Sequence, residues 1–509
     1  MPSIELTVNG EAVVVDDDTA TLLDVLRGQV GATSVKDGCS PQGQCGCCTV
    51  LVDGQPRVSC VTPVRRVRGR SVTTVEGLPD EARARWGDAF AASGGSQCGF
   101  CTPGIVCRFE GLRAKGVVPD DRAKAADALL AHLCRCTGWQ SILDAWAHDG
   151  TPVELGSRAA AEERAAIEGG VPQAVGPHVA LGEGGFADDT APRDALVAVP
   201  DGDGWAVAPT RAEALAAAGK IQGRRTTAVF APPIELPPGD FDAVLQTTWT
   251  EPAYLETDAS WCEPGGEPAS LLGNGGAFGG KLDSDLGAVA RRLADEHGHP
   301  VRVVLAREDV VRRGPKRPPL AGGINADGTG LIRVARTPGI VDAIAMVAPD
   351  VTVEEVDVVG PPTSAAIRGA GWLEAAVLVA AARGDVGWIA GPGGGEATAA
   401  IDDDGTVRIH VRAGETLDEV TLRSYCVGAA HMALGLVRSE SIAVDPETGE
   451  IHDLTIRSFG VLRAVDTPAI EVTVEPDPHP AVNGSDAVMA AVAAAAWLHE
   501  GTPGSWPIA

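Results

Sequence analysis

The sequence predicts an α+β protein of several domains, and three observations lead to this. Residues 3–16 alternate in polarity like two short strands, residues 80–133 carry helical patterns with caps, and strand-like and helix-like segments are mixed from residue 178 onward. The chain has 509 residues, too many for one compact core. We therefore expect two to four domains.

The first residues predict a small domain built on a β-hairpin. Two alternating runs flank Asn9-Gly10, which is the strongest short-range hairpin signal. A capped helix is expected over Thr19 to Leu26, and an apolar strand over Thr49 to Val52. Between the helix and the strand lies a loop rich in cysteine and glycine, residues 37–48.

The cysteines are concentrated in one part of the chain. Ten of the twelve lie between Cys39 and Cys136. The first residues lack the basic and apolar regions of a secretory signal, so we expect a cytoplasmic protein, in which disulfides are rare. The clustering therefore indicates metal binding.

The first cysteine set has the spacing of a two-iron cluster site. Its spacing is C-x5-C-x2-C with a distant fourth cysteine, one residue longer than the plant-type pattern. Glycines in the loop would let backbone amides point at the sulfurs. Zinc is the alternative, but zinc ribbons use two C-x2-C pairs and this set has one. The proposed ligands are Cys39, Cys45, Cys48 and Cys60, with Cys47 as a buried neighbour.

The second cysteine set lies at helix boundaries. Helices are expected over Glu81 to Ala92, from Thr102-Pro103 to about Lys115, and over Asp121 to Leu133. Two antiparallel helices could bring a C-x2-C pair against a C-x-C pair. The proposed ligands are Cys98, Cys101, Cys134 and Cys136.

These motifs resemble those of a known family. The first set followed by QCGFC at 97–101 and CRCTG at 134–138 is similar to the iron–sulfur portion of the xanthine oxidase family of molybdenum hydroxylases, over residues 1–150. The resemblance implies a β-grasp plant-type ferredoxin domain at 1–78 and a helical four-helix domain at 79–155, each with one [2Fe–2S] cluster. It also places Gln97 and Cys136 near a molybdopterin, and Trp139 where the family has a tyrosine.

The rest of the chain resembles a shortened large subunit of the same family. A linker with one helical stretch, Arg158 to Glu168, is expected at 156–177, and an α+β molybdopterin-subunit-like region at 178–509. The segments EPAYLETD at 251–258, GGAFGGK at 275–281 and AIRGAG at 366–371 carry the likeness. For a molybdopterin, the resemblance implies contacts from Gln97, Gly276, Phe278, Gly279 and Arg368.

Three differences from the family indicate a silent catalytic region. Residues 414–419 bring acidic side chains to a Gly-Gln-Gly turn that contacts the pterin in the family, and these would repel an anionic cofactor. The family's catalytic glutamate corresponds to Ser485, or to Asp486 if the register slips by one, and serine cannot accept a proton at neutral pH. Ala370 replaces a substrate-stacking phenylalanine.

The leading hypothesis is an electron-transfer subunit of a molybdenum hydroxylase complex. Electrons would come from a molybdopterin-binding catalytic subunit, pass through both clusters, and reach an FAD-binding subunit or another acceptor. FAD is expected on a partner because no segment resembles the family's flavin domain. The net charge of −28 argues against nucleic acid and anionic membranes as partners, and no segment looks transmembrane.

Two other readings remain open. One is a compact molybdenum hydroxylase that binds its own cofactor and uses Asp486 as the base. The other is a ferredoxin-like binding or sensor protein outside any enzyme complex. The ten histidines show no metal-binding spacing, and Cys262 and Cys426 are expected to be buried small apolar residues.

Overall fold

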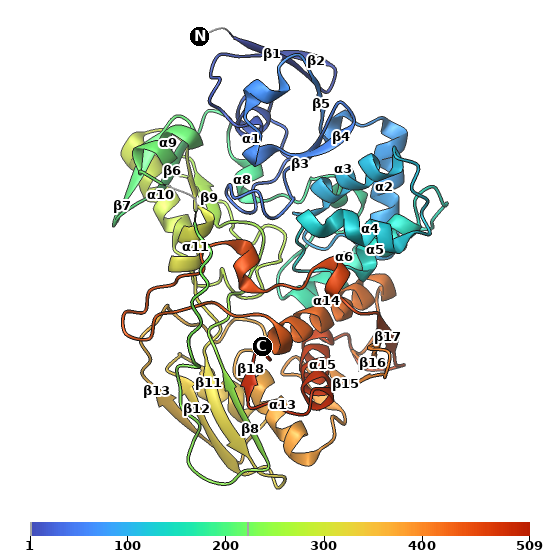
Figure 1. Cartoon of the computed structure of the whole chain (residues 1–509), viewed down its shortest axis with the longest axis vertical. Coiled ribbons are helices and arrows are strands. Elements are labelled where there is room, and N and C mark those ends of the chain that lie inside the picture. Colours follow the sequence, from blue (N-terminus) through green and yellow to red (C-terminus); the bar gives the residue numbers. More distant parts are fainter. Residues whose placement is uncertain (1–2, 221–222, 509) are drawn as a thin grey trace.

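The computed structural model describes residues 3–220 and 223–508 (Figure 1). The first domain holds a five-stranded sheet in the order β2-β1-β5-β3-β4. The predicted hairpin is confirmed, because Val8 pairs with Glu11 and the turn residues Asn9 and Gly10 have φ of 52° and 88°. The strands are β1 (Ile4–Val8), β2 (Glu11–Val15), β3 (Thr49–Val52), β4 (Gln55–Val58) and β5 (Ser71–Thr73).

The predicted first helix begins later than expected. The Thr21 hydroxyl accepts the Asp24 amide and the Asp24 carboxylate accepts the Thr21 amide, so Thr21 is the N-cap of α1 (Leu22–Asp24). Thr19 instead donates to Asp17 in the preceding turn. A wider π-helical turn, Val25–Val30, continues α1 to Gly31.

The second domain is helical, as predicted. Its four helices are α2 (Asp80–Ser93), α3 (Thr102–Arg113), α4 (Arg122–Ala128) and α5 (Gln140–Ala147). Buried aromatic rings join α2, α3 and α5, with Trp86 stacked on Trp146 at 6.1 Å between centroids. The third helix is shorter than expected because Leu133 leaves the helical path, and its amide donates to the Cys45 carbonyl at 3.0 Å.

The described part of the remaining chain contains three sheets. Their orders are β7-β6-β10-β9, β13-β12-β11-β8-β18 and β14-β15-β16-β17. The strands are β6 (Leu196–Asp201), β7 (Gly204–Ala208), β8 (Ala243–Thr247), β9 (Ala259–Cys262), β10 (Val301–Val304), β11 (Leu320–Ile324), β12 (Gly330–Ala335), β13 (Val351–Val356), β14 (Ile389–Ala390), β15 (Glu396–Ile401), β16 (Val407–Arg412), β17 (Ile470–Val474) and β18 (Ser505–Trp506).

Ten helices pack around these sheets in the described ranges. They are α6 (Arg158–Gly169), α7 (Pro177–Ala180), α8 (Ala187–Thr190), α9 (Arg211–Ala217), α10 (Leu286–His297), α11 (Arg307–Arg313), α12 (Ile340–Ala345), α13 (Trp372–Arg383), α14 (Glu419–Arg438) and α15 (Ser485–His499). α14 is long and apolar enough by composition to cross a membrane, but 89% of its most apolar window is buried inside the molecule. It is a core helix, packed against α15.

The segment predicted as a linker contains the expected helix, α6, and one face of this helix is buried against the third region. α6 lies against α14, and the Arg164 side chain is completely buried. Arg164 donates to the carbonyls of Ala413, Glu415, Thr416 and Val482. The sequence composition predicted a solvent-exposed linker, but these long-range hydrogen bonds fix the helix to the third region.

Buried charges join the third region to both N-terminal domains. Arg307 donates to the carbonyls of Gly38 and Leu255, each at 2.6 Å by its Nη2. Arg135, between two predicted ligands, forms two hydrogen bonds to Glu440 at 2.5 and 2.8 Å. The third region therefore contacts the loops that carry both cysteine sets.

Candidate metal centres and an adjoining cavity

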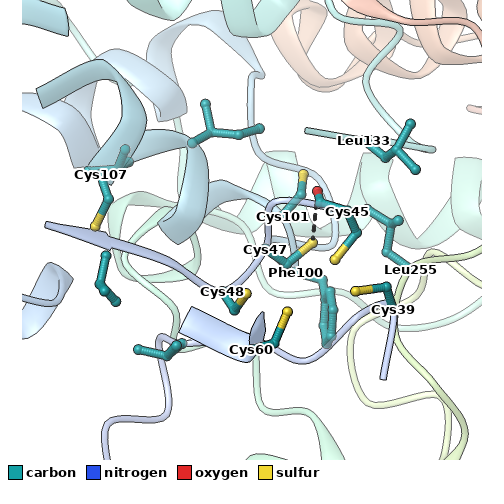
Figure 2. Packing of buried hydrophobic residues seen from close by; sticks show 14 of the residues in the cluster. Cys39, Cys45, Cys47, Cys48, Cys60, Phe100, Cys101, Cys107, Leu133 and Leu255 are labelled. Carbon is teal, nitrogen blue, oxygen red and sulfur yellow. Dashed lines mark hydrogen bonds between the residues drawn. The ribbon is translucent and has the colours of Figure 1, made fainter. Parts of the chain in front are cut away.

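The first set of predicted ligands converges inside the first domain. Figure 2 shows Cys39, Cys45, Cys48 and Cys60 with their sulfurs directed toward a common centre, and all four are buried. Contacts with the thiols of Cys45 and Cys60 lower the pKa of the Cys39 thiol. The Gln42 amide also donates to the Cys39 sulfur at 3.1 Å. These contacts favour the thiolate, the form that binds iron, at Cys39, and they raise the pKa of the partner thiols of Cys45 and Cys60.

Glycine is required where the chain passes close to these sulfurs. A Cβ on Gly38 would lie 3.2 Å from the Cys45 sulfur, and one on Gly46 would lie 2.5 Å from the His132 ring. Gly46 also has φ of 74°. Cys47 is buried, as predicted, and its sulfur lies 3.8 Å from the Cys45 carbonyl oxygen (Figure 2).

The second set of predicted ligands forms two pairs of thiols. The sulfurs of Cys98 and Cys136 lie 3.4 Å apart, and the Cys134 thiol contacts that of Cys101. The Cys101 contact, opposed by burial and aided by Thr137, lowers the pKa of Cys134 to about 7. A two-iron cluster binds each iron through two thiolates, so paired thiols suit it.

A direct backbone hydrogen bond joins the two sites. The Leu133 amide donates to the Cys45 carbonyl at 3.0 Å. Cys45 belongs to the first set and Leu133 is bonded to Cys134 of the second set. A short through-bond route therefore connects the two groups of predicted ligands.

A cavity of about 200 Å³ lies beside the second cysteine set. Cys98 and Cys136 line it together with every residue predicted to contact a molybdopterin and the candidate base: Gln97, Gly276, Phe278, Gly279, Arg368 and Asp486. Gly276 has φ of 79°, and a Cβ there would lie 3.1 Å from the Cys98 sulfur. The glycine loop thus touches the cluster site.

The polar groups of this cavity bind one another. Arg368 Nε donates to Asp486 at 2.7 Å and Nη2 donates to the Ser485 hydroxyl at 2.6 Å. Gln97 donates to the Ser424 hydroxyl at 3.0 Å. Glu168 accepts the Ser485 amide at 2.9 Å, and burial raises the pKa of its carboxyl. The charged lining is thus two carboxylates and one guanidinium.

The sequence reasoning missed several lining residues and misplaced one acidic segment. Glu168, Gln173 and Tyr425 line the cavity, and no local motif marked them. The loop 414–419 does not line it, because Arg164 binds the carbonyls of this loop and the Glu415 side chain is exposed. The negative charge that faces the cavity comes from Glu168 and Asp486 instead.

The two kinds of site differ in how well they fit the groups that the resemblance implies. Each four-thiol set provides the donors of a [2Fe–2S] cluster. The cavity, at about 200 Å³, is below the roughly 300–1,000 Å³ typical of organic ligand sites. Its two carboxylates are each paired with an arginine, Glu168 with Arg164 at 2.9 Å and Asp486 with Arg368 at 2.7 Å, so the lining as it stands has no free cation for an anionic pterin and does not fit a molybdopterin.

Comparisons with known proteins cover both parts of the chain. Residues 6–68 match the 2Fe-2S iron-sulfur cluster binding domain and residues 74–147 the [2Fe-2S] binding domain. The nicotinate dehydrogenase small FeS subunit of Eubacterium barkeri is 37% identical over 142 residues, which are 28% of this chain and 89% of that protein. The aldehyde oxidoreductase of Megalodesulfovibrio gigas is 42% identical over 146 residues, 28% of this chain but 16% of that protein.

Solved structures extend the likeness beyond the cluster domains. The aldehyde oxidoreductase from Desulfovibrio gigas has a TM-score of 0.71 at 16% identity, over 97% of each chain. The aldehyde oxidoreductase from Desulfovibrio desulfuricans has a TM-score of 0.66, also at 16% identity and 97% of each chain. At this identity the likeness shows the fold of the third region. The chain belongs to the xanthine oxidase and aldehyde oxidoreductase family and carries that family's two [2Fe–2S] cluster-binding domains.

Proposed function

We propose that this protein is a cytoplasmic electron-transfer subunit of a molybdenum hydroxylase complex. Each cluster, when bound, carries one electron at a time. The observation that carries the proposal is the hydrogen bond from the Leu133 amide to the Cys45 carbonyl, at 3.0 Å. It links the ligand loops directly, so an electron can pass between the two sites within one chain.

The surroundings of the two sites support a direction for this path. The second site borders the cavity through Cys98 and Cys136, where a redox partner's cofactor could approach. The first site reaches solvent at residues 41–44, which are half-buried, while residues 45–48 beyond them are buried. We propose that electrons enter at the second site and leave from the first.

We further propose that the chain has lost its own catalytic site. Arg368 is already bound to Asp486 and Ser485, the two residues that could correspond to the family's base: Ser485 could not act as a base, and Asp486 is held in an ion pair. The molybdopterin would then lie on a partner catalytic subunit, and FAD on another partner. The relative named as a small FeS subunit supports a multi-subunit arrangement.

One observation favours a second candidate, a compact hydroxylase. Gln97, the glycine loop, Arg368 and Asp486 come from distant segments, and yet they line one cavity. A shift of the Arg368–Asp486 pair would give that cavity a free guanidinium and a free carboxylate. The same residues could then bind a cofactor and act as a base.

Metal analysis separates these functions. The chain is purified from cells that make molybdopterin, and iron and molybdenum are counted per polypeptide. About four irons without molybdenum support the electron-transfer subunit. Molybdenum near one per chain contradicts the loss of the catalytic site and supports the compact hydroxylase. Clusters in a chain that captures no molybdenum or flavin subunit from the same cells would favour the binding or sensor protein.

A further inference from the structure

The cysteine loop of the first domain meets the solvent at residues 41–44. Residues 37–40 are buried and residues 41–44 are half-buried. The Gln42 amide in this half-buried part donates to the Cys39 sulfur at 3.1 Å. The molecular surface at Gln42 is therefore one hydrogen bond away from a predicted cluster ligand.

Arginines from two distant segments lie around this half-buried loop. Arg457 donates to the Gln44 carbonyl at 2.8 Å and to the Leu130 carbonyl at 2.6 Å. The Gln42 side chain donates to the Leu454 carbonyl, and the Leu454 amide donates to the Arg224 carbonyl, both at 3.0 Å.

The arginine rim is the name used below for Arg224, Arg225 and Arg457. Arg224 and Arg225 are exposed and Arg457 is half-buried. All three therefore carry positive charge beside the loop, in a chain whose net charge is −28.

Apolar side chains lie beside the loop, and the segment that carries Cys60 is rich in arginine. Val61 is 49% exposed and contacts Gly43, and Leu130 is 43% exposed. Residues 57–70, which include the predicted ligand Cys60, hold five arginines and no acidic residue, and all five are exposed. Of these, Arg70 lies 3.6 Å from the Asp53 carboxylate, and Arg65 donates to the Asp18 carbonyl.

We propose that the arginine rim is the docking surface for a small acidic protein that carries a one-electron centre. The inference rests on the proposed function and names the chemistry of the electron partner. The chain as a whole is strongly negative and repels an acidic partner, so a local positive surface beside the loop orients such a partner toward the loop. Val61 and Leu130 provide apolar contact. One electron leaves the reduced iron–sulfur centre of the first domain, and the oxidised centre of the carrier gains it; no bond is made or broken.

Stopped-flow kinetics with an acidic flavodoxin test this surface. Reduced flavodoxin is mixed with the oxidised cluster-containing chain, because docking is the same for either direction of transfer. Arg224→Glu/Arg225→Glu should lower the second-order rate constant about ten-fold at low ionic strength and reduce its salt dependence. The matched control Arg292→Glu/Arg336→Glu makes the same charge change at exposed sites on α10 and after β12, and should change the rate by less than about two-fold.

Basic cytochrome c provides the opposite probe. Its reduction by the reduced chain should become faster in the rim variant. Equal rates in the rim and control variants would overturn the proposal. A chain that is a dimer in solution and becomes a monomer in the rim variant would also overturn it, because the surface would then bind a second copy of the chain.

A binding titration of flavodoxin with the oxidised chain distinguishes failure of the docking surface from failure of the proposed function. Binding that weakens in the rim variant supports the surface even if no electron is transferred. Unchanged binding overturns the surface even if dithionite reduces both clusters normally.

Discussion

The buried polar groups at the two cysteine sites and those of the cavity beside them have different partners. At the cysteine sites, the sulfurs contact one another and accept amides such as that of Gln42. In the cavity, Arg368 is bound to Asp486 and Ser485, and Glu168 accepts two backbone amides of the α15 N-terminus. The thiols are thus arranged for a ligand, whereas the charged groups of the cavity are paired within the chain and the Tyr425 hydroxyl that also lines it has no hydrogen-bond partner. This difference shows that a fold can retain a cavity while the charged side chains that line the cavity form ion pairs within the chain.

Removing one predicted ligand should give the largest effect on this comparison. Cys134→Ser should remove the iron–sulfur signal of the second site and leave that of the first, lowering iron from about four to about two per chain. The measurement is low-temperature electron paramagnetic resonance with iron analysis. Cys107→Ser is the matched control, since Cys107 is a buried thiol of α3 outside both sets. Retention of both signals in Cys134→Ser would refute the ligand assignment.

Breaking the buried ion pair next to the second site should strongly destabilise the protein. Arg135→Met leaves the Glu440 carboxylate buried without its cation, which should cost about 3–5 kcal/mol in free energy of unfolding. Denaturant unfolding of the cluster-containing chain measures it. Arg292→Met breaks an exposed i,i+4 pair with Glu296 and should cost about 0.5 kcal/mol. Similar losses in both variants would mean that the buried pair does not anchor the cysteine loop on the segment that follows α14.

The helix under the second site should make stability depend on pH. Burial, with a smaller effect of Arg135, lowers the pKa of His431 on α14 to about 4. The unfolded chain binds this proton near pH 6.5 and the folded chain does not, so stability is full above about pH 6.5 and falls as pH drops toward 4. The expected contribution between pH 7 and pH 5 is about 2 kcal/mol, measured by urea unfolding. His431→Gln should remove this part of the slope; an unchanged slope would contradict the assignment.

The most local effect is expected from the glycine loop that separates the cavity from the cluster. Gly276→Ala places a Cβ 3.1 Å from the Cys98 sulfur in a left-handed backbone conformation, which should cost about 1–3 kcal/mol and alter the spectrum of the second site alone. Gly265→Ala is the control, because Gly265 also has positive φ but no atom within 4 Å of its Cβ position. A spectrum that stays unchanged in both variants would show that the glycine loop is not in close contact with the second cluster site.

Local patterns identified much of the first 155 residues. The Asn9-Gly10 hairpin follows from the backbone conformations that those two residues allow, and α2 and α3 lie close to their predicted ranges. The burial of Cys47, Cys262 and Cys426 was also anticipated. The start of α1 was misjudged because Thr19 and Thr21 are both suitable caps, and the Asp24 carboxylate selects the second.

Sequence by itself determined the two cysteine sets and the family, because the spacings and the flanking glycines are set within short segments. It also named the cavity residues Gln97, Gly276 and Arg368, through likeness to the family. Tertiary structure alone decided that one face of α6 is buried and that Glu168 reaches the N-terminus of α15, a contact across 317 residues. It also paired Arg368 with Asp486. The electrostatic state of the cavity depends on which charges meet across the folded chain, and no local pattern encodes those distances.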